Sequence, residues 1–353
     1  MVDDSALMRR LLGQIFAKEA DFEVQVARDG LEALDALQSY RPDVITLDVH
    51  MPQMGGLECL DRIMVERPCP VVMVSSLTAA GADATLEALR LGAVDFVAKP
   101  DGAVSLGIHD LAPVLVRTVR AAAGVRLKPS LRLKEKVRHQ ISGGAQKSRE
   151  HPAGAGPPVT ERAVGEGLVL VGTSTGGPPA LEALLTPLPA DFPWPIVVAQ
   201  HMPATFTASL ARRLDGLCSL AVSEVVQPTV LKAGCVYIGR GDADVVISRR
   251  AAGLVAMPAP PRDYPWHPST DRLVRSAMAL MAPARLIGVL MTGMGNDGAL
   301  AMAELHALGG KTIAEAEESA VVWGMPGELV KAGGADWVEP LTGIASRLRS
   351  LTP

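Results

Sequence analysis

The feature that most constrains the fold is an alternation of short apolar runs with amphipathic helical patterns. In residues 1–123 the apolar runs span 22–26, 44–47, 71–74 and 94–98, and a helical pattern follows each one. This alternation predicts a doubly wound α/β domain with a mainly parallel sheet. Such sheets bind ligands at the carboxyl ends of their strands, so functional side chains are expected there.

Five polar residues fall at the predicted strand ends. They are Asp3, Asp4, Asp48, Ser75 and Lys99. Three carboxylates that converge on one edge would repel one another without a cation, and their hard oxygen atoms suit Mg²⁺. A lysine and a hydroxyl on neighbouring strand ends would then hold an anionic group such as a phosphoryl group. A solvated acidic rim is the alternative for any one of these residues.

This segment resembles a two-component receiver domain through DDS at 3–5, LDVHMP at 47–52, MVSS at 73–76 and KP at 99–100. The resemblance implies a flavodoxin-like fold in which Asp48 is the phosphoacceptor and Asp3, Asp4 and Asp48 hold Mg²⁺. It further implies that Ser75 and Lys99 contact the phosphoryl group. Phe96 would be the switch aromatic, and the peptide bond between Lys99 and Pro100 would be cis.

The chain departs from this family at its first strand. Receivers have a longer apolar strand before the acidic pair, whereas only Met1 and Val2 precede Asp3 here. Loss of that strand would expose backbone edges on two neighbouring strands and leave a gap in the core. We therefore expect the native protein to begin further upstream. An intact mass equal to that of this chain would contradict the expectation.

Residues 124–166 are predicted to be a flexible interdomain linker. The apolar periodicity lapses there, the first half is basic, and the second half is rich in glycine and proline. Contact of the basic run with an acidic partner or nucleic acid is the less favoured alternative.

A second domain is predicted over 167–353, and its first motif is LVLVGTSTGGPP at 168–179. The motif indicates a buried strand, a tight glycine turn and a helix that begins near the two prolines. Ser174 lies at the tip of the turn. A hydroxyl beside the free N–H groups of a helix N-terminus suits a nucleophile next to an oxyanion site. A phosphate-binding or purely structural turn is the alternative.

Two further apolar strands bring chemically suitable partners to the same edge. The run 196–199 leads to His201, and the run 286–292 leads to Asp297. Serine, histidine and aspartate are the residue types that acyl transfer needs as nucleophile, base and orienting carboxylate. His267 competes for the role of base, but a strand end fixes a side chain better than the proline-rich loop that holds His267. Shorter runs at 220–226, 235–238, 244–247 and 254–257 predict a small added β subdivision.

A dinucleotide site is the rival interpretation. Residues 293–298 read G-x-G-x-x-G after a strand, and Glu315 or Glu317 follows at a suitable distance. Asp297, however, would put a carboxylate where the pyrophosphate lies, and the unit comes late in its domain. The turn at Ser174 also lacks a Walker lysine, and Gln200 stands where a ribose would require an acid.

The second domain resembles the catalytic domain of chemotaxis protein-glutamate methylesterases. The motifs are GTSTGG at 172–177, QHMP at 200–203, PSTD at 268–271, LMTGMGNDG at 290–298 and GMP at 324–326. The resemblance implies a Rossmann-like hydrolase that removes methyl groups from glutamyl esters of methyl-accepting chemoreceptors and deamidates some receptor glutamines. Ser174 would be the nucleophile, His201 the base and Asp297 its orienting carboxylate. Thr175 and the N–H of Met294 would support the oxyanion and the histidine.

The same resemblance implies that a chemotaxis histidine kinase is the phosphodonor and that phosphorylation of Asp48 moves the receiver off the catalytic edge. His267 departs from the family's histidine spacing, which leaves its role open. A response regulator with a DNA-binding or non-catalytic output is disfavoured, because the second domain is not basic and no member of the triad is missing.

Composition sets the remaining expectations. The formal net charge of -4 gives no case for nucleic acid, and no apolar run is long enough to span a bilayer. The four scattered cysteines suit reduced thiols rather than disulfides or zinc. We therefore expect a cytoplasmic protein. Together with the motifs above, we expect a monomer with two doubly wound parallel-sheet domains and Mg²⁺ as its only cofactor.

Overall fold

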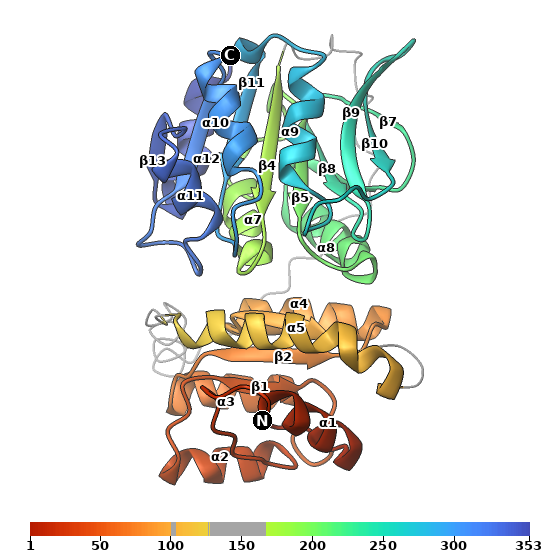
Figure 1. Ribbon diagram of the computed structural model, residues 1–353. Coiled ribbons are helices and arrows are strands. Elements are labelled where there is room, and N and C mark those ends of the chain that lie inside the picture. Colours follow the sequence, from red (N-terminus) through yellow and green to blue (C-terminus); the bar gives the residue numbers. More distant parts are fainter. Residues whose placement is uncertain (100–103, 126, 128–166) are drawn as a thin grey trace, which may run out of the picture.

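The computed structural model describes residues 1–99, 104–125, 127 and 167–353, which form two α/β domains (Figure 1). The N-terminal domain has a parallel sheet of order β1-β2-β3, as the apolar runs predicted. Its strands are β1 (Ile45–Asp48), β2 (Val71–Ser75) and β3 (Asp95–Ala98). Its helices are α1 (Ala6–Phe16), α2 (Gly30–Ser39), α3 (Gly56–Glu66), α4 (Ala79–Leu91) and α5 (Val104–Ala123).

The apolar run 22–26 is not a strand, so that part of the prediction was wrong. Val2 makes only isolated parallel bridges, to Ala27 and to Leu47. Neither bridge reaches residues 22–26, which have no strand partner in the described part of the chain. Val24 and Val26 consequently remain exposed, beside a cavity of about 630 Å³ that reaches into the core.

The C-terminal domain is organised around a seven-stranded sheet of order β13-β12-β11-β4-β5-β8-β6, and every pair in it is parallel. The strands are β4 (Leu168–Thr173), β5 (Ile196–Gln200), β6 (Ala221–Val225), β8 (Cys235–Gly239), β11 (Leu286–Leu290), β12 (Lys311–Glu315) and β13 (Trp337–Glu339). The chain builds outward from β4 on one side and then returns to β11 on the other. The strand order therefore reverses between β4 and β11, where open α/β sheets bind ligands.

Helices cover both faces of this sheet and bury two apolar clusters. On one face α7 packs against α8 and α12, and on the other α10 packs against α9 and α11. The helices are α7 (Gly177–Leu185), α8 (Ala204–Leu217), α9 (Thr270–Met278), α10 (Ala299–Ala307), α11 (Met325–Lys331) and α12 (Leu341–Leu351), with a short 3-10 turn at Pro283–Arg285. The predicted doubly wound class is thus confirmed for this domain.

The expected β subdivision is smaller than predicted. Only β7 (Thr229–Val230), β9 (Asp244–Arg250) and β10 (Gly253–Ala259) form a separate antiparallel sheet. The runs 220–226 and 235–238 belong instead to the main sheet, as β6 and β8. Strand β8 lies between β5 and β6, so its residues 236–239 are buried. An apolar run this short does not reveal which of two sheets it joins, and the prediction for these runs failed for that reason.

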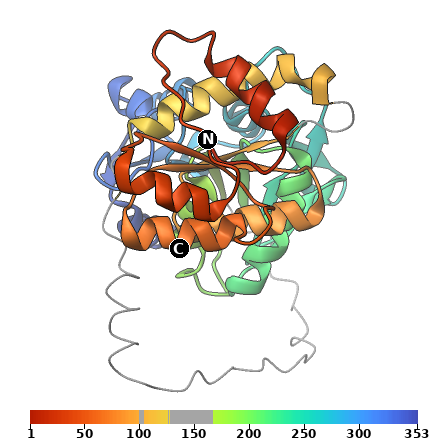
Figure 2. The same ribbon diagram turned by 90° about the horizontal axis from the view of Figure 1, so that it is seen from below.

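The N-terminal domain lies against the end of the C-terminal domain at which strands β4 and β5 terminate (Figures 1 and 2). Helix α4 packs against α8 and α7. The ring of Phe96 lies 4.4 Å from that of Phe206, centroid to centroid, and Arg213 joins Glu87 of α4 to Glu182 of α7. The interface therefore combines an aromatic contact with a charged one.

The linker prediction for 124–166 and the cis bond before Pro100 concern residues that lie almost wholly outside the described part of the chain. Among the helices that the structure describes, none has both the length and the apolar character needed to cross a bilayer.

Candidate active site

Ser174 directly follows β4 in a turn that its backbone bonds hold rigidly. Its N–H donates to the Thr292 carbonyl at 3.0 Å, and its own carbonyl accepts from Gln200 Nε2 at 3.0 Å. Gly176 adopts a φ of +77°, which glycine reaches without strain, and α7 starts one residue later. The turn thus sets the half-buried Ser174 near the N–H groups that begin α7, as the sequence predicted.

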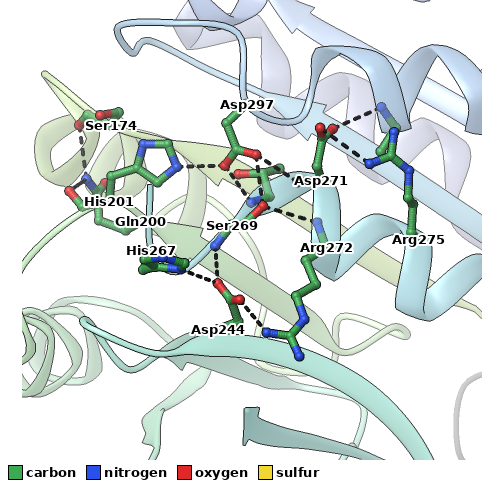
Figure 3. A network of polar contacts seen from close by, with 12 residues as sticks. Ser174, Gln200, His201, Asp244, His267, Ser269, Asp271, Arg272, Arg275 and Asp297 are labelled. Carbon is green, nitrogen blue, oxygen red and sulfur yellow. Dashed lines mark hydrogen bonds and ion pairs between the residues drawn. The ribbon is translucent and has the colours of Figure 1, made fainter. Parts of the chain in front are cut away.

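His201 and Asp297 meet at this edge. His201 Nε2 lies 2.8 Å from Asp297 Oδ2 (Figure 3). The Asp297 carboxylate is buried and also accepts bonds from the hydroxyl of Ser269 and from the N–H groups of Thr270 and Asp271. Burial alone would raise the pKa of Asp297, but the bond from His201 and these backbone donors outweigh it and hold that pKa below its usual value.

The partners of His201 fix its tautomer. Ionised Asp297 can only accept, so Nε2 carries the hydrogen and Nδ1 presents a lone pair. Nδ1 is buried and has no hydrogen-bond partner among the described residues. The ring of Trp266 stacks on the imidazole with centroids 5.9 Å apart and planes within 6°. The imidazole therefore has a fixed orientation and one free basic nitrogen.

Ser174 and His201 line one cavity of about 490 Å³, which Thr175, Trp266, His267 and Met294 also line. The described contacts include no bond between the Ser174 hydroxyl and His201. Bonds of this kind often tighten only when substrate binds, so the shared cavity is the relevant observation. Residues of the N-terminal domain, among them Asp95 and Phe96, close the other side of the cavity.

The Thr175 hydroxyl, which was expected to support the oxyanion or the histidine, contacts the N-terminal domain in this structure. Its Oγ1 donates to Asp95 Oδ2 at 2.5 Å, across the interface between the domains. Burial raises the pKa of Asp95 to about 6, although the bond from Thr175, the N–H of Phe96 and the charge of Arg117 act in the opposite direction. No signal in the sequence identifies Asp95, because the contact depends on how two separate domains dock.

The dinucleotide interpretation loses its support at residues 293–298. A Cβ on Gly293 would lie 2.8 Å from the Cβ of Ser174, so this glycine allows the loop to pack against the serine turn. Asp297 is turned toward His201, and Glu315 is buried with its carboxylate bonded to the N–H of Thr292 and the hydroxyl of Ser319. Glu315 is therefore committed to the protein's own structure and is not poised for a ribose.

His267, the competing histidine, forms a separate pair. Its Nδ1 lies 2.9 Å from Asp244 Oδ1, and the described contacts do not join it to Asp297. His201, and not His267, is therefore the histidine that contacts the Asp297 carboxylate. Ser269 caps α9 and also bonds to Asp297.

The acidic residues of the N-terminal domain also converge. Ligand oxygens of Asp3, Asp4 and Asp48 all lie within 4.8 Å of one another, an arrangement that suits a hard cation. Lys99 Nζ lies 2.8 Å from Asp48 Oδ2 and 3.0 Å from Asp3 Oδ2. Burial alone would lower the pKa of Lys99, but these two carboxylates raise it. The lysine therefore stays charged.

Two further predicted residues lie close to this cluster. Ser75 is buried at the end of β2, and its hydroxyl donates to the Gly81 carbonyl at 3.2 Å. Phe96 follows on the neighbouring strand, half-buried against Phe206 of the other domain. The side chain expected to act as a switch thus lies at the interface itself.

Both domains match known families. Residues 1–106 match the response regulator receiver domain, and residues 169–348 match the CheB methylesterase model. A protein-glutamate methylesterase/protein-glutamine glutaminase 2 of Rhodopseudomonas palustris is 57% identical over 98% of this chain and 95% of its own. A protein-glutamate methylesterase/protein-glutamine glutaminase 3 of Vibrio cholerae is 44% identical over 94% of this chain and 90% of its own.

A solved structure agrees with these matches. The CheB methylesterase catalytic domain of Thermotoga maritima is 36% identical, with a TM-score of 0.52, and the match covers 54% of this chain and all of that one. The fold and the matches define a response regulator with a hydrolase-family output domain. The chain belongs to the CheB methylesterase family.

Proposed function

We propose that the protein is a phosphorylation-controlled serine esterase that demethylates methylglutamate residues of chemoreceptors and deamidates receptor glutamines. One observation carries the proposal: the His201–Asp297 pair at 2.8 Å leaves His201 Nδ1 without a partner among the described residues, and His201 lines the same cavity as Ser174, at the point where the strand order reverses. The names of its relatives support the substrate class.

In the proposed reaction Ser174 Oγ attacks the side-chain carbonyl carbon of the methylated glutamate. His201 Nδ1 takes the hydroxyl proton and passes it to the methoxide leaving group, which departs as methanol. Water then attacks the acyl-enzyme with His201 again as the base, and the product is a glutamate carboxylate. Asp297 stabilises the imidazolium and keeps the imidazole oriented.

The oxyanion of the tetrahedral intermediate needs hydrogen-bond donors beside Ser174. The hydroxyl of Thr175 and the backbone N–H of Met294 are the donors that we propose, and both residues line the cavity. Because the Thr175 hydroxyl is bonded to Asp95, it becomes available only when the two domains separate.

Control is proposed to come from the N-terminal domain. Asp48 is the phosphoacceptor for a chemotaxis histidine kinase, and Asp3, Asp4 and Asp48 are the residues that would hold Mg²⁺, which supplies the positive charge that transfer of a phosphoryl group requires. Ser75 and Lys99 would contact the phosphoryl group once it is attached. Phosphorylation would then favour the separated state of the two domains.

We propose that the receiver domain spans residues 1–123, the linker 124–166 and the methylesterase domain 167–353. We also propose that the protein is a monomer and that it is cytoplasmic. A cytoplasmic location lets a kinase and the receptor's methylation sites both reach the protein.

Methanol release from methylated receptor membranes, with and without a small-molecule phosphodonor, tests the proposal. Wild-type protein should release methanol faster with the phosphodonor. Ser174→Ala should release none while Asp48 still becomes phosphorylated, and the phosphorylation serves as the control for folding of the receiver. Substantial release by Ser174→Ala would refute the assignment of the nucleophile.

A further inference from the structure

A second histidine–carboxylate pair lies beside Ser174 and takes no part in the acyl transfer described above. His267 lines the same cavity as Ser174 and His201, and its Nδ1 lies 2.9 Å from Asp244 Oδ1 (Figure 3). The Asp244 side chain is fully buried, whereas the His267 side chain keeps 21% of its surface exposed. The Nδ1 edge of the ring is therefore turned toward the protein interior, and the rest of the ring borders the cavity.

Asp244 is held as an anion that can only accept hydrogen bonds. Its carboxylate accepts from the N–H of Ser269 at 2.8 Å and from the guanidinium of Arg272 at 2.5 Å. Burial alone would raise the pKa of Asp244, but His267, Ser269 and Arg272 together lower it. His267 Nδ1 must then carry the hydrogen, and in the neutral ring Nε2 is left as an acceptor.

We infer that His267 is a specificity-determining residue whose Nε2 accepts a hydrogen bond from the side-chain NH₂ of a glutaminyl substrate. The inference rests on the proposed function and concerns the choice between its two substrates. The leaving oxygen of a methyl ester carries no hydrogen, so it gains nothing from an acceptor at this position. An amide NH₂ gains a bond, and a site built to bond such a group discriminates strongly.

The same bond strengthens as the amide reacts. When the tetrahedral intermediate collapses, the C–N bond breaks and its electron pair stays on nitrogen. The proton that His201 took from Ser174 passes to that nitrogen, which leaves as ammonia. A nitrogen that gains a proton becomes a better donor, so an acceptor at His267 stabilises the departing group more than the bound substrate.

Ser269 links this pair to the proposed catalytic pair. Its N–H donates to Asp244 and its hydroxyl donates to Asp297, so one residue fixes both carboxylates (Figure 3). Ser269, the N-cap of α9, therefore fixes the positions of both imidazoles relative to each other through the two carboxylates.

The test compares His267→Ala with His267→Asn in the full-length, phosphodonor-activated protein. Asparagine can keep an N–H donor toward Asp244 but lacks the ring nitrogen that faces the cavity, so it separates a structural role from substrate recognition. Ammonia release from glutaminyl receptor and methanol release from methylated receptor are measured on the same preparations. Both variants should lower the ratio of ammonia to methanol kcat/KM by about tenfold.

Equal losses of both activities, or a wild-type ratio in His267→Asn, would overturn the inference. A wild-type protein that releases methanol but no ammonia would also overturn it. A wild-type protein that releases neither overturns the proposed function instead, so the two failures are distinguishable. If His267→Ala does not fold, His267→Asn decides the question alone.

Discussion

The hydroxyl of Thr175, on the serine turn of the C-terminal domain, is bonded to the carboxylate of Asp95, at the start of β3 in the N-terminal domain. One hydrogen bond therefore joins the proposed oxyanion donor to the domain that is proposed to regulate it. Docking in this arrangement covers the cavity and also occupies a group that the proposed reaction needs.

The first prediction compares Asp95→Ala with Asp95→Asn. Asparagine keeps an oxygen that can accept the Thr175 hydroxyl, whereas alanine leaves that hydroxyl without its partner. A hydrogen bond of this kind contributes about 1 kcal/mol, so without phosphodonor Asp95→Ala should release methanol roughly fivefold faster than Asp95→Asn. With phosphodonor the two variants should be equal. Equal rates in both conditions would show that the bond does not restrain the docked state.

The pH dependence of docking follows from the same residue. Burial raises the pKa of Asp95 to about 6 in the docked state, and on separation the carboxyl returns to water and its ordinary pKa of 3.8. The docked state therefore binds the proton more tightly. The contribution of Asp95 to docking is fully present below the ordinary pKa and is lost as pH rises through about 6.

Unstimulated methanol release, divided by the phosphodonor-stimulated rate at each pH, measures this effect. The division cancels the pH dependence of the chemistry itself. The ratio should increase as pH rises from about 5 to about 7 in wild-type protein. It should be flat in Asp95→Asn, whose side chain does not titrate. A slope shared by both proteins would assign the dependence to another group.

The sequence predicted the centre of the C-terminal sheet because β4, β5 and β11 are fully buried. Continuous apolar runs such as 286–292 have few alternatives, and the end of each strand fixes where the next polar residue lies. Ser174, His201 and Asp297 could therefore be assigned to one edge from spacing alone.

The remaining contacts depend on pairings that spacing does not encode. The run 22–26 has strand-like composition, but a strand also needs a partner, and the two isolated bridges of Val2 go to Ala27 and Leu47, outside that run. The run 235–238 could have joined either sheet. Asp95 and Thr175 meet only because two domains dock through surfaces that carry no periodic pattern.

The proposed role of Asp297 predicts a large effect for Asp297→Asn. An amide NH₂ in place of Oδ2 would donate to His201 Nε2, so the ring hydrogen would move to Nδ1 and that nitrogen could no longer act as a base. Ser-His-Asp enzymes lose about 10⁴-fold in kcat through this change of tautomer. Methanol release at saturating substrate measures the loss. A decrease of less than about tenfold would argue that Asp297 does not set the tautomer.

Metal removal should affect regulation and spare the chemistry. The proposed Mg²⁺ ligands lie in the N-terminal domain, whereas Ser174, His201 and Asp297 lie in the other one. Chelation by EDTA should therefore abolish stimulation by a phosphodonor and leave the unstimulated rate unchanged, and excess Mg²⁺ should restore the stimulation. Asp48→Asn should behave like the chelated protein without any chelator. An unstimulated rate that falls with EDTA would contradict this separation.

Thr292, two residues beyond the end of β11, supports the serine turn, and its loss should affect both stability and rate. Its hydroxyl donates to the Thr175 carbonyl at 2.9 Å and accepts from the N–H groups of Val321 and Val322. Thr292→Val would leave these buried groups unpaired, which should lower the free energy of unfolding of the C-terminal domain by about 2 kcal/mol or more.

Thr292→Ser is the matched control, because serine keeps the hydroxyl and loses only a methyl group. The four tryptophans at 194, 266, 323 and 337 all lie in the C-terminal domain, so denaturation followed by tryptophan fluorescence reports on that domain alone. Thr292→Val should unfold at lower denaturant concentration than Thr292→Ser and release methanol more slowly, since Thr175 is then held less firmly. Identical unfolding curves for the two variants would show that the hydroxyl does not support the turn.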